Sequence, residues 1–135
     1  MAQAVRTTMT MAHRVRSTIA EVNAGKTLVA AVPGMKHRIV DFTLIAIGGA
    51  AAAATSVDIN GTRSSAAVKP AVVAVAALTQ SAAVKPDTAN VTLLADGASF
   101  TALDENTAIT IGIAGSDLTT ATHIDAIIVV ATEKA

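Results

Sequence analysis

The sequence contains no cysteine, no tryptophan and no tyrosine, and its two aromatic side chains are Phe42 and Phe100. Without cysteine the chain can form neither disulfide bonds nor thiolate metal sites, which is typical of a protein made in a reducing compartment. It also lacks the aromatic platforms on which single-stranded nucleic acids and many sugars stack. These absences argue against a disulfide scaffold and against nucleic acid as a partner.

Long hydrophobic runs are also lacking. The longest, residues 44–54, is interrupted by a glycine pair and is shorter than the run of about 18 apolar residues that a membrane-spanning helix needs. Residues 1–22 show no apolar segment typical of a secretory signal. The threonine-rich residues 7–10 argue against an amphipathic membrane-binding helix over residues 1–16. We therefore expect a chain that stays in the cytoplasm and has no membrane partner.

Small aliphatic residues dominate what is present. At 135 residues the chain is one domain by size, able to bury about two thirds of its unfolded surface. Alanine, valine, isoleucine and leucine allow backbones to approach closely, which favours thin stacked layers of β-sheet. Residues 1–16 mix small, polar and basic side chains with no apolar periodicity. We expect them to form an extended N-terminal arm, followed by a single β-sandwich domain over residues 17–135.

The net charge is zero, but the charges are unevenly distributed. Residues 1–40 carry six Lys or Arg and one Glu, whereas residues 41–135 carry four Lys or Arg and nine Asp or Glu. The basic segment either folds onto its own acidic body, reaches an acidic partner, or is a solvated tail without a partner. The candidate partner-contact residues are Arg6, Arg14, Arg16, Lys26, Lys36 and Arg38.

Residues 36–49, KHRIVDFTLIAIGG, predict the strand around which the domain is organised. The first part is mixed in polarity, and residues 42–47 are apolar on both faces except for Thr43. This pattern favours a central strand that enters a two-layer core. Before it, residues 17–23 predict a weak first strand, and Pro33-Gly34 predicts a turn.

Alternation predicts further strands along the chain. Residues 55–60 and 62–69 fit a hairpin with its turn at Asn60-Gly61, and residues 50–54 fit a loop or bulge better than a helix. The hexapeptide SAAVKP occurs at residues 65–70 and 81–86, and each copy predicts a strand end at its proline. Residues 71–80 between them favour a strand, although a helix that starts at Pro70 remains the alternative.

The C-terminal part shows the clearest alternation. Residues 107–114 alternate isoleucine with small or polar residues, and Gly115-Ser116-Asp117 predicts a turn before a long last strand over residues 122–132. The regular spacing gives about eight strands, which is typical of an antiparallel β-sandwich and too short for helical crossovers.

No residue pattern indicates catalysis, a cofactor or a metal. His13, His37 and His123 lack the spacing of zinc ligands. His123 and Asp125 share a strand face, but a polar pair at a strand end is the simpler interpretation. The adjacent carboxylates of Asp104 and Glu105 point in different directions on a strand or turn and make a poor acid–base pair. We do not expect an enzyme.

Several segments resemble the head-decoration, or cement, proteins of tailed bacteriophages. They are VNAGKTL at residues 22–28, IVDFTLIAIGG at 39–49, and LADGASF at 94–100 followed by Asp104 and NTAITI at 106–111. The resemblance covers roughly residues 17–132 and weakens in the arm. It implies a jelly-roll sandwich without catalytic residues that binds the outside of the capsid shell, bridges neighbouring capsomers of the major capsid protein and forms homo-oligomers.

This resemblance leads to a functional hypothesis. The chain is expected to be a virion protein on the capsid exterior, assembled in the host cytoplasm, with the basic arm and first strand reaching capsid subunits or another copy. The alternative is a receptor- or carbohydrate-binding β-sandwich module of a phage fibre or tail. That alternative is weakened by the lack of tryptophan and tyrosine.

Overall fold

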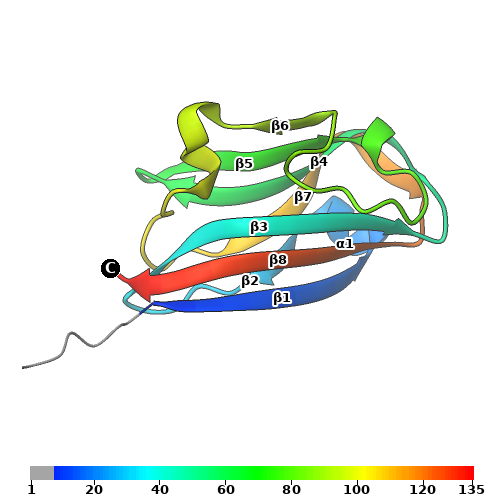
Figure 1. Cartoon of the computed structure of the whole chain (residues 1–135). Coiled ribbons are helices and arrows are strands. Elements are labelled where there is room, and N and C mark those ends of the chain that lie inside the picture. Colours follow the sequence, from blue (N-terminus) through cyan, green and yellow to red (C-terminus); the bar gives the residue numbers. More distant parts are fainter. Residues whose placement is uncertain (1–7) are drawn as a thin grey trace, which may run out of the picture.

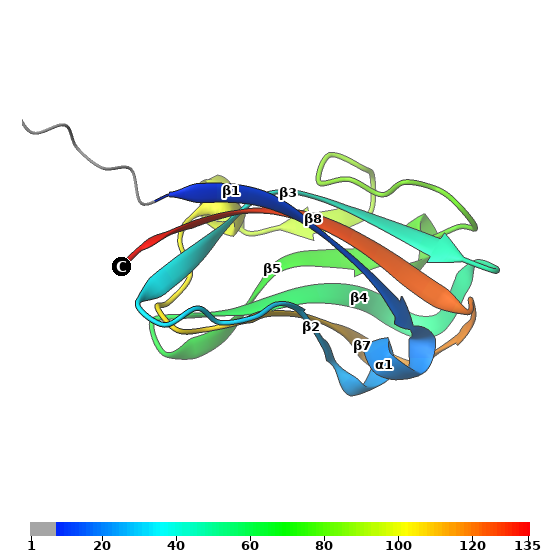
Figure 2. The ribbon, with the colours of Figure 1, turned by 90° about the horizontal axis from the view of Figure 1, so that it is seen from below.

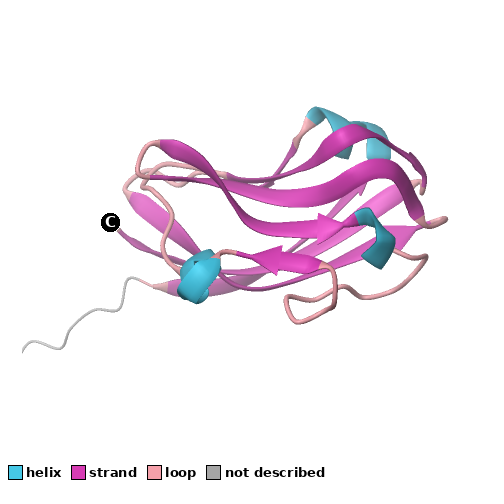
Figure 3. Cartoon of the chain, turned by 90° about the horizontal axis from the view of Figure 1, so that it is seen from above, coloured by secondary structure: helices cyan, strands magenta, loops and turns pink. Residues whose placement is uncertain are grey.

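The computed structural model describes residues 8–135 and confirms an all-β sandwich with eight strands in two antiparallel sheets. Figure 3 shows that short helical segments join the strands at the margins of the sandwich. The elements in chain order are β1 (Met9–Thr18), α1 (Ile19–Ala24), β2 (Lys26–Val29), β3 (Met35–Ile47), β4 (Ala51–Arg63), β5 (Ala66–Ala74), the 3-10 helix η1 (Val75–Ala77), β6 (Val91–Leu93), the 3-10 segment η2 (Ala95–Phe100), β7 (Ile109–Thr120) and β8 (His123–Lys134).

The strand order resembles that of a jelly roll. One sheet has the order β1-β8-β3 and the other β2-β7-β4-β5-β6. The first strand therefore pairs with the last, the second with the second-last, and the fourth with the fifth, as in the nested pairing of two Greek keys. The third strand does not pair with the sixth, because β6 joins β5 and β3 is instead bridged by the loop before β6. Figures 1 and 2 show the sheets as two facing layers, with α1 closing one end.

The core lies between these layers. On β8 every second residue from Ile124 to Val130 is at most 1% exposed, and these side chains face Val57 and Ile59 of β4 and Ile109 and Ile111 of β7. The period of two puts every inward side chain on one face of its sheet. Burial of this aliphatic surface supplies the main driving force for folding.

The strand predicted at residues 36–49 is confirmed as β3, but its predicted central position is wrong. β8 is the central strand of the three-stranded sheet, and β3 lies at its edge. The outer edge of β3 is partly covered by the loop before β6, since the backbones of Leu44 and Val84 exchange two hydrogen bonds of 2.9 Å. Strand order depends on contacts between distant residues, which local apolar patterning does not report.

The predicted β4–β5 hairpin is confirmed, but its turn is not at Asn60-Gly61. β4 runs on to Arg63 and the chain turns at Ser64 and Ser65, both with positive φ. The carboxylate of Asp104 accepts hydrogen bonds from the backbone N–H groups of Ser64 and Ser65, at 2.9 and 2.8 Å. Gly61 serves packing instead, because a Cβ atom there would lie 2.8 Å from Leu103 Cδ1.

Pro70 does not end a strand as predicted. β5 continues through it to Ala74, and Pro70 lies where the pairing with β4 shifts register between Ile59 and Gly61. A missing N–H is tolerated at such an irregularity. The second copy of the hexapeptide lies in the loop before β6. Residues 71–80 form a strand only to Ala74, followed by η1.

The bulge that was one of the two alternatives for residues 50–54 is confirmed, and a second irregularity replaces a predicted turn. Residues 50–54 contain the bulged start of β4, where Ala53 has a φ of 71°. The turn predicted at residues 115–117 is wrong, because β7 continues to Thr120. Gly115 adopts a φ of 84° next to Thr55, where the pairing of β4 with β7 is irregular.

The N-terminal prediction needs the largest correction. Met9–Thr18 is not part of an arm, because it forms β1 and pairs with β8 along its whole length. The strand predicted at residues 17–23 is mostly the helix α1, which begins at a capping box formed by Thr18 and Glu21. Residues 1–7, including Arg6, lie outside the described part of the chain.

Candidate functional site

His13 and His37 line the same pocket, whereas His123 lies at the start of β8. His37 is buried; its ring nitrogens contact the Thr132 hydroxyl at 2.8 Å and the Ala30 carbonyl at 2.9 Å. Since the carbonyl can only accept, Nε2 is the donor in the contact with Ala30. This arrangement joins the chain before β3 to β8, which is a structural role.

Over residues 8–135, no three His, Cys, Asp or Glu side chains lie close enough together to hold a metal ion. No helix in that range is long and apolar enough to cross a membrane.

Asp125 on β8 is the centre of a charged cluster. Its carboxylate is 1% exposed and accepts hydrogen bonds from Arg16 Nε at 2.8 Å, Arg16 Nη2 at 3.0 Å and Arg14 Nη2 at 3.0 Å. The hydrogen bonds from Arg16, followed by those from Arg14 and the positive charges of both, lower the pKa of Asp125 to about 2. Asp125 therefore forms ion pairs with two arginines of β1. Part of the basic N-terminal segment thus contacts the acidic remainder of its own chain, which was one of the three predicted alternatives.

Strand alternation places this cluster on the outward side of the three-stranded sheet, which we call the outer face. Its central residues are uncovered by any other described element and are aliphatic and only half-buried. The members are Thr10, Ala12, Arg14 and Arg16 of β1, Asp125, Ile127, Val129, Ala131 and Glu133 of β8, and Lys36, Arg38, Asp41, Thr43, Ile45 and Ile47 of β3. The outer face therefore has an aliphatic centre with charged residues around it.

The outer face brings together four of the six predicted contact residues. Arg14 and Arg16 come from β1, and Lys36 and Arg38 from β3. Arg38 lies 3.9 Å from Glu133 across the sheet. Lys26 is elsewhere, on β2, where it pairs with Glu21 and lowers the pKa of that carboxyl to about 2. That these side chains contact a partner stays a prediction.

Sequence reasoning missed the aliphatic centre of the outer face. The signal was present, because residues 42–47 are apolar at odd and even positions and so are residues 126–131. That pattern was interpreted as burial on both faces. The structure covers only one face, so Ile45, Ile47 and Ile127 remain half-exposed.

A second feature, which we call the apolar groove, opens under the N-terminal half of β1. It has a volume of about 630 Å³ and is lined by Met9, Met11, His13, Val29, Ala30, Val32, Pro33, Met35, His37 and Thr132. β2 ends at Val29, and Met9 and Met11 on the inward side of β1 are not among the residues packed against the core, whereas Val15 is. Met9, Met11 and Val32 are 58%, 49% and 41% exposed.

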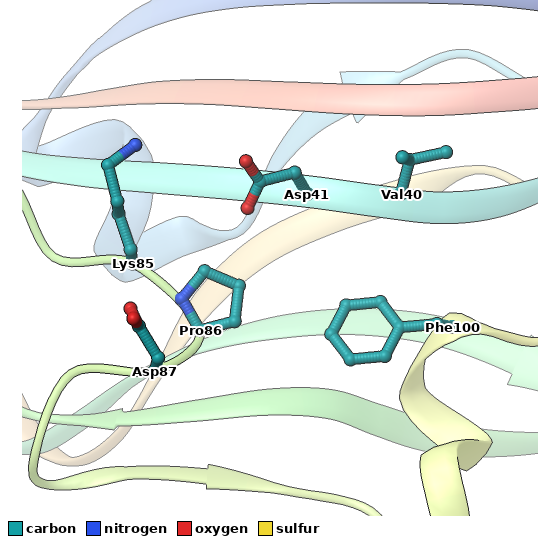
Figure 4. Close-up of a pocket in the computed structure, with 6 residues that line it drawn as sticks. All are labelled: Val40, Asp41, Lys85, Pro86, Asp87 and Phe100. Carbon is teal, nitrogen blue, oxygen red and sulfur yellow. The ribbon is translucent and has the colours of Figure 1, made fainter.

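A smaller cleft of about 340 Å³ lies between β3 and the loop before β6 (Figure 4). Its apolar part consists of Val40, Pro86 and Phe100, and its polar part of Asp41, Lys85 and Asp87. The amine of Lys85 reaches β3, where it donates a hydrogen bond to the Thr43 hydroxyl at 3.0 Å. In the cleft the Phe100 ring lies next to Pro86, and the carboxylates of Asp41 and Asp87 lie on the far side of that proline (Figure 4).

Comparisons with protein-family models, with curated proteins and with solved structures find no match for this chain.

Proposed function

We propose that this protein is a structural virion component that binds the outside of a tailed-bacteriophage capsid shell and bridges neighbouring capsomers of the major capsid protein. The observation that carries the proposal is the outer face: the partly buried aliphatic residues Ile127 and Val129 of the central strand β8, with the charged residues Asp125, Arg14 and Asp41 next to them on the same face. An apolar centre within a polar rim is the usual anatomy of a protein–protein interface.

The mechanism is attachment without chemistry. Burial of the aliphatic centre against a capsid subunit supplies affinity, and the rim charges supply orientation and association rate. Arg14 and Arg16 already form ion pairs with Asp125 of their own chain, so they attract a partner less strongly. We therefore expect the aliphatic residues to supply most of the affinity. Each bound copy stabilises the assembled shell by mass action, and copies that also contact one another gain from multivalency.

The outer face is tested by replacing Ile127 and Val129 together with glutamine. We expect binding to shells assembled without the protein to weaken about 10- to 30-fold, because two half-exposed aliphatic contacts are lost on binding. Co-sedimentation with shells measures the affinity, and electron microscopy of the same particles shows whether density is added outside the capsid.

The matched control is Val72→Gln, which changes a half-exposed β-branched residue on the outward side of the other sheet. It should bind shells as the unmodified chain does. If the double variant binds shells as well as the unmodified chain does, the outer face is not the binding surface. If the unmodified chain does not bind shells, the capsid function is wrong.

The alternative, a carbohydrate-binding module of a phage fibre or tail, draws support from the cleft at Phe100. An aromatic ring in the same cleft as the carboxylates of Asp41 and Asp87 is suited to stack a sugar whose hydroxyl hydrogen bonds those carboxylates accept. Under this alternative a glycan array gives hits that Phe100→Ala removes. If the glycan array gives no hits and the protein binds capsid shells, the carbohydrate-binding alternative is rejected.

A further inference from the structure

β1 presents the longest open edge in the described part of the protein. It pairs over its ten residues with β8, and no described strand pairs with its other side. The other edges are shorter or covered. β2 has four residues and β6 has three, and β3 is bridged by Val84 and Gln80. The part of β7 that β2 leaves unpaired packs beside α1, and β5 is left unpaired by β6 only outside residues 71–73. A long open edge exposes unpaired N–H and C=O groups and is a template for another strand.

The usual protection of such an edge is weak here. Charged side chains on an edge strand discourage pairing, but the two arginines of β1 extend over the outer face to Asp125, where hydrogen bonds hold them. The inward side of the same strand carries Met9 and Met11, both largely exposed above the apolar groove. The edge of β1 is therefore open. Its inward side is apolar, and on its outward side the charges of Arg14 and Arg16 are partly neutralised by Asp125.

We propose that β1 pairs with β1 of a second copy of this chain, antiparallel and about a two-fold axis at His13. In an antiparallel pair, residues directly opposite each other point to the same side of the sheet. An inward residue of one copy must therefore lie opposite an inward residue of the other, which requires the two-fold axis to pass through a residue and not between two residues. An axis at Arg14 would oppose Arg14 to itself, and an axis at Val15 would oppose Arg14 to Arg16. Of the remaining positions, His13 pairs the greatest length of strand, residues 9–17 with residues 17–9 of the second copy.

This register pairs Met11 with an aliphatic residue and keeps the arginines of the two copies apart. On the inward side Met11 lies opposite Val15, so a methionine that is exposed in one copy packs on an aliphatic residue of the other. On the outward side Arg14 lies opposite Ala12 and Arg16 opposite Thr10, so no like charges meet. The two three-stranded sheets become one sheet of six strands, and the groove under each β1 is bordered by the second copy.

The dimer deepens the self-association part of the proposed function, but its geometry depends only on β1. It leaves the outer face of both copies on the same side of the six-stranded sheet, where both can meet one shell. Its failure and the failure of shell binding are distinguishable, because the dimer is measured without capsid.

The absence of cysteine makes the test direct. In the proposed register the Cα atoms of the two His13 residues lie about 4.5–5.5 Å apart, within the range that a disulfide bridges. We expect His13→Cys to form a disulfide-linked dimer almost completely under mild oxidation. The matched control Thr10→Cys lies six residues from its own equivalent, about 20 Å away along the strand, and should remain a free thiol.

Sedimentation of the unmodified chain completes the test. At about 50 µM it should be a dimer, and Met11→Lys, an inward charge on the edge strand, should raise the dissociation constant at least tenfold. A monomeric unmodified chain overturns the proposal. So does a dimer that Met11→Lys leaves unchanged, or one in which Thr10→Cys cross-links as well as His13→Cys. If His13→Cys does not fold by circular dichroism, sedimentation of the other two proteins decides.

Discussion

Replacing Phe42 with alanine is expected to lower the free energy of unfolding by about 3–5 kcal/mol. Phe42 is 2% exposed, belongs to the inward side of β3 and lies opposite Ile128. The surrounding residues are aliphatic and belong to two sheets whose spacing is set by many other contacts, so they cannot collapse into the space left by the ring. The loss therefore includes both the transfer free energy of the ring and the cost of a cavity.

Urea unfolding followed by far-ultraviolet circular dichroism measures this change, because the chain has no tryptophan or tyrosine for fluorescence. The protein concentration is held constant, since self-association contributes to apparent stability. Phe42→Leu, which keeps most of the apolar volume, should lose clearly less than Phe42→Ala. A loss below about 1 kcal/mol for Phe42→Ala would mean that the two layers are not packed on each other at this residue.

Replacing Asp125 with asparagine is expected to cost about 2 kcal/mol near neutral pH and almost nothing near pH 2. The carboxylate is buried under Arg14 and Arg16, and hydrogen bonds from Arg16 are the largest cause that lowers its pKa to about 2. A pKa lowered on folding means that the charged form is favoured in the folded state. Its contribution is complete above the ordinary pKa of about 4 and is lost as the pH falls from about 4 to about 2.

Denaturation of the unmodified and Asp125→Asn chains at several pH values between 2 and 7 measures the difference. Taking the difference removes the contribution of Glu21, whose pKa is also lowered to about 2 and which both chains retain. The control Asp117→Asn changes an exposed carboxylate and should follow the unmodified chain at every pH. A difference between Asp125→Asn and the unmodified chain that stays constant from pH 2 to 7 would rule out a linkage through this ion pair.

The candidate site was only partly predictable from the sequence. The uneven charge distribution pointed to Arg14, Arg16, Lys36 and Arg38 as a group, and the structure places all four on one face. Nothing local could show that Asp125, 109 residues beyond Arg16, takes up part of that charge. Whether the apolar outward residues of β3 and β8 are covered depends equally on where the second sheet lies.

Local turn chemistry misled for a similar reason. Asn60-Gly61 is a favourable hairpin sequence, yet Gly61 is needed where Leu103 packs against β4, and Asp104 holds the actual turn at Ser64 and Ser65. Conversely, the capping box of Thr18 and Glu21 was readable in the sequence as a helix start and was overlooked in favour of weak strand alternation.

The sequence by itself determined the fold class, the number of strands and most inward-facing residues, because alternation, turn residues and a lack of long helical patterns act within a few residues of one another. Tertiary structure alone decided that β8 and not β3 is central, that residues 9–18 complete a sheet and are not an arm, and that the aliphatic outer face and the edge of β1 are left open. These features depend on which distant strands pair, and that choice is made by the packing of the whole chain.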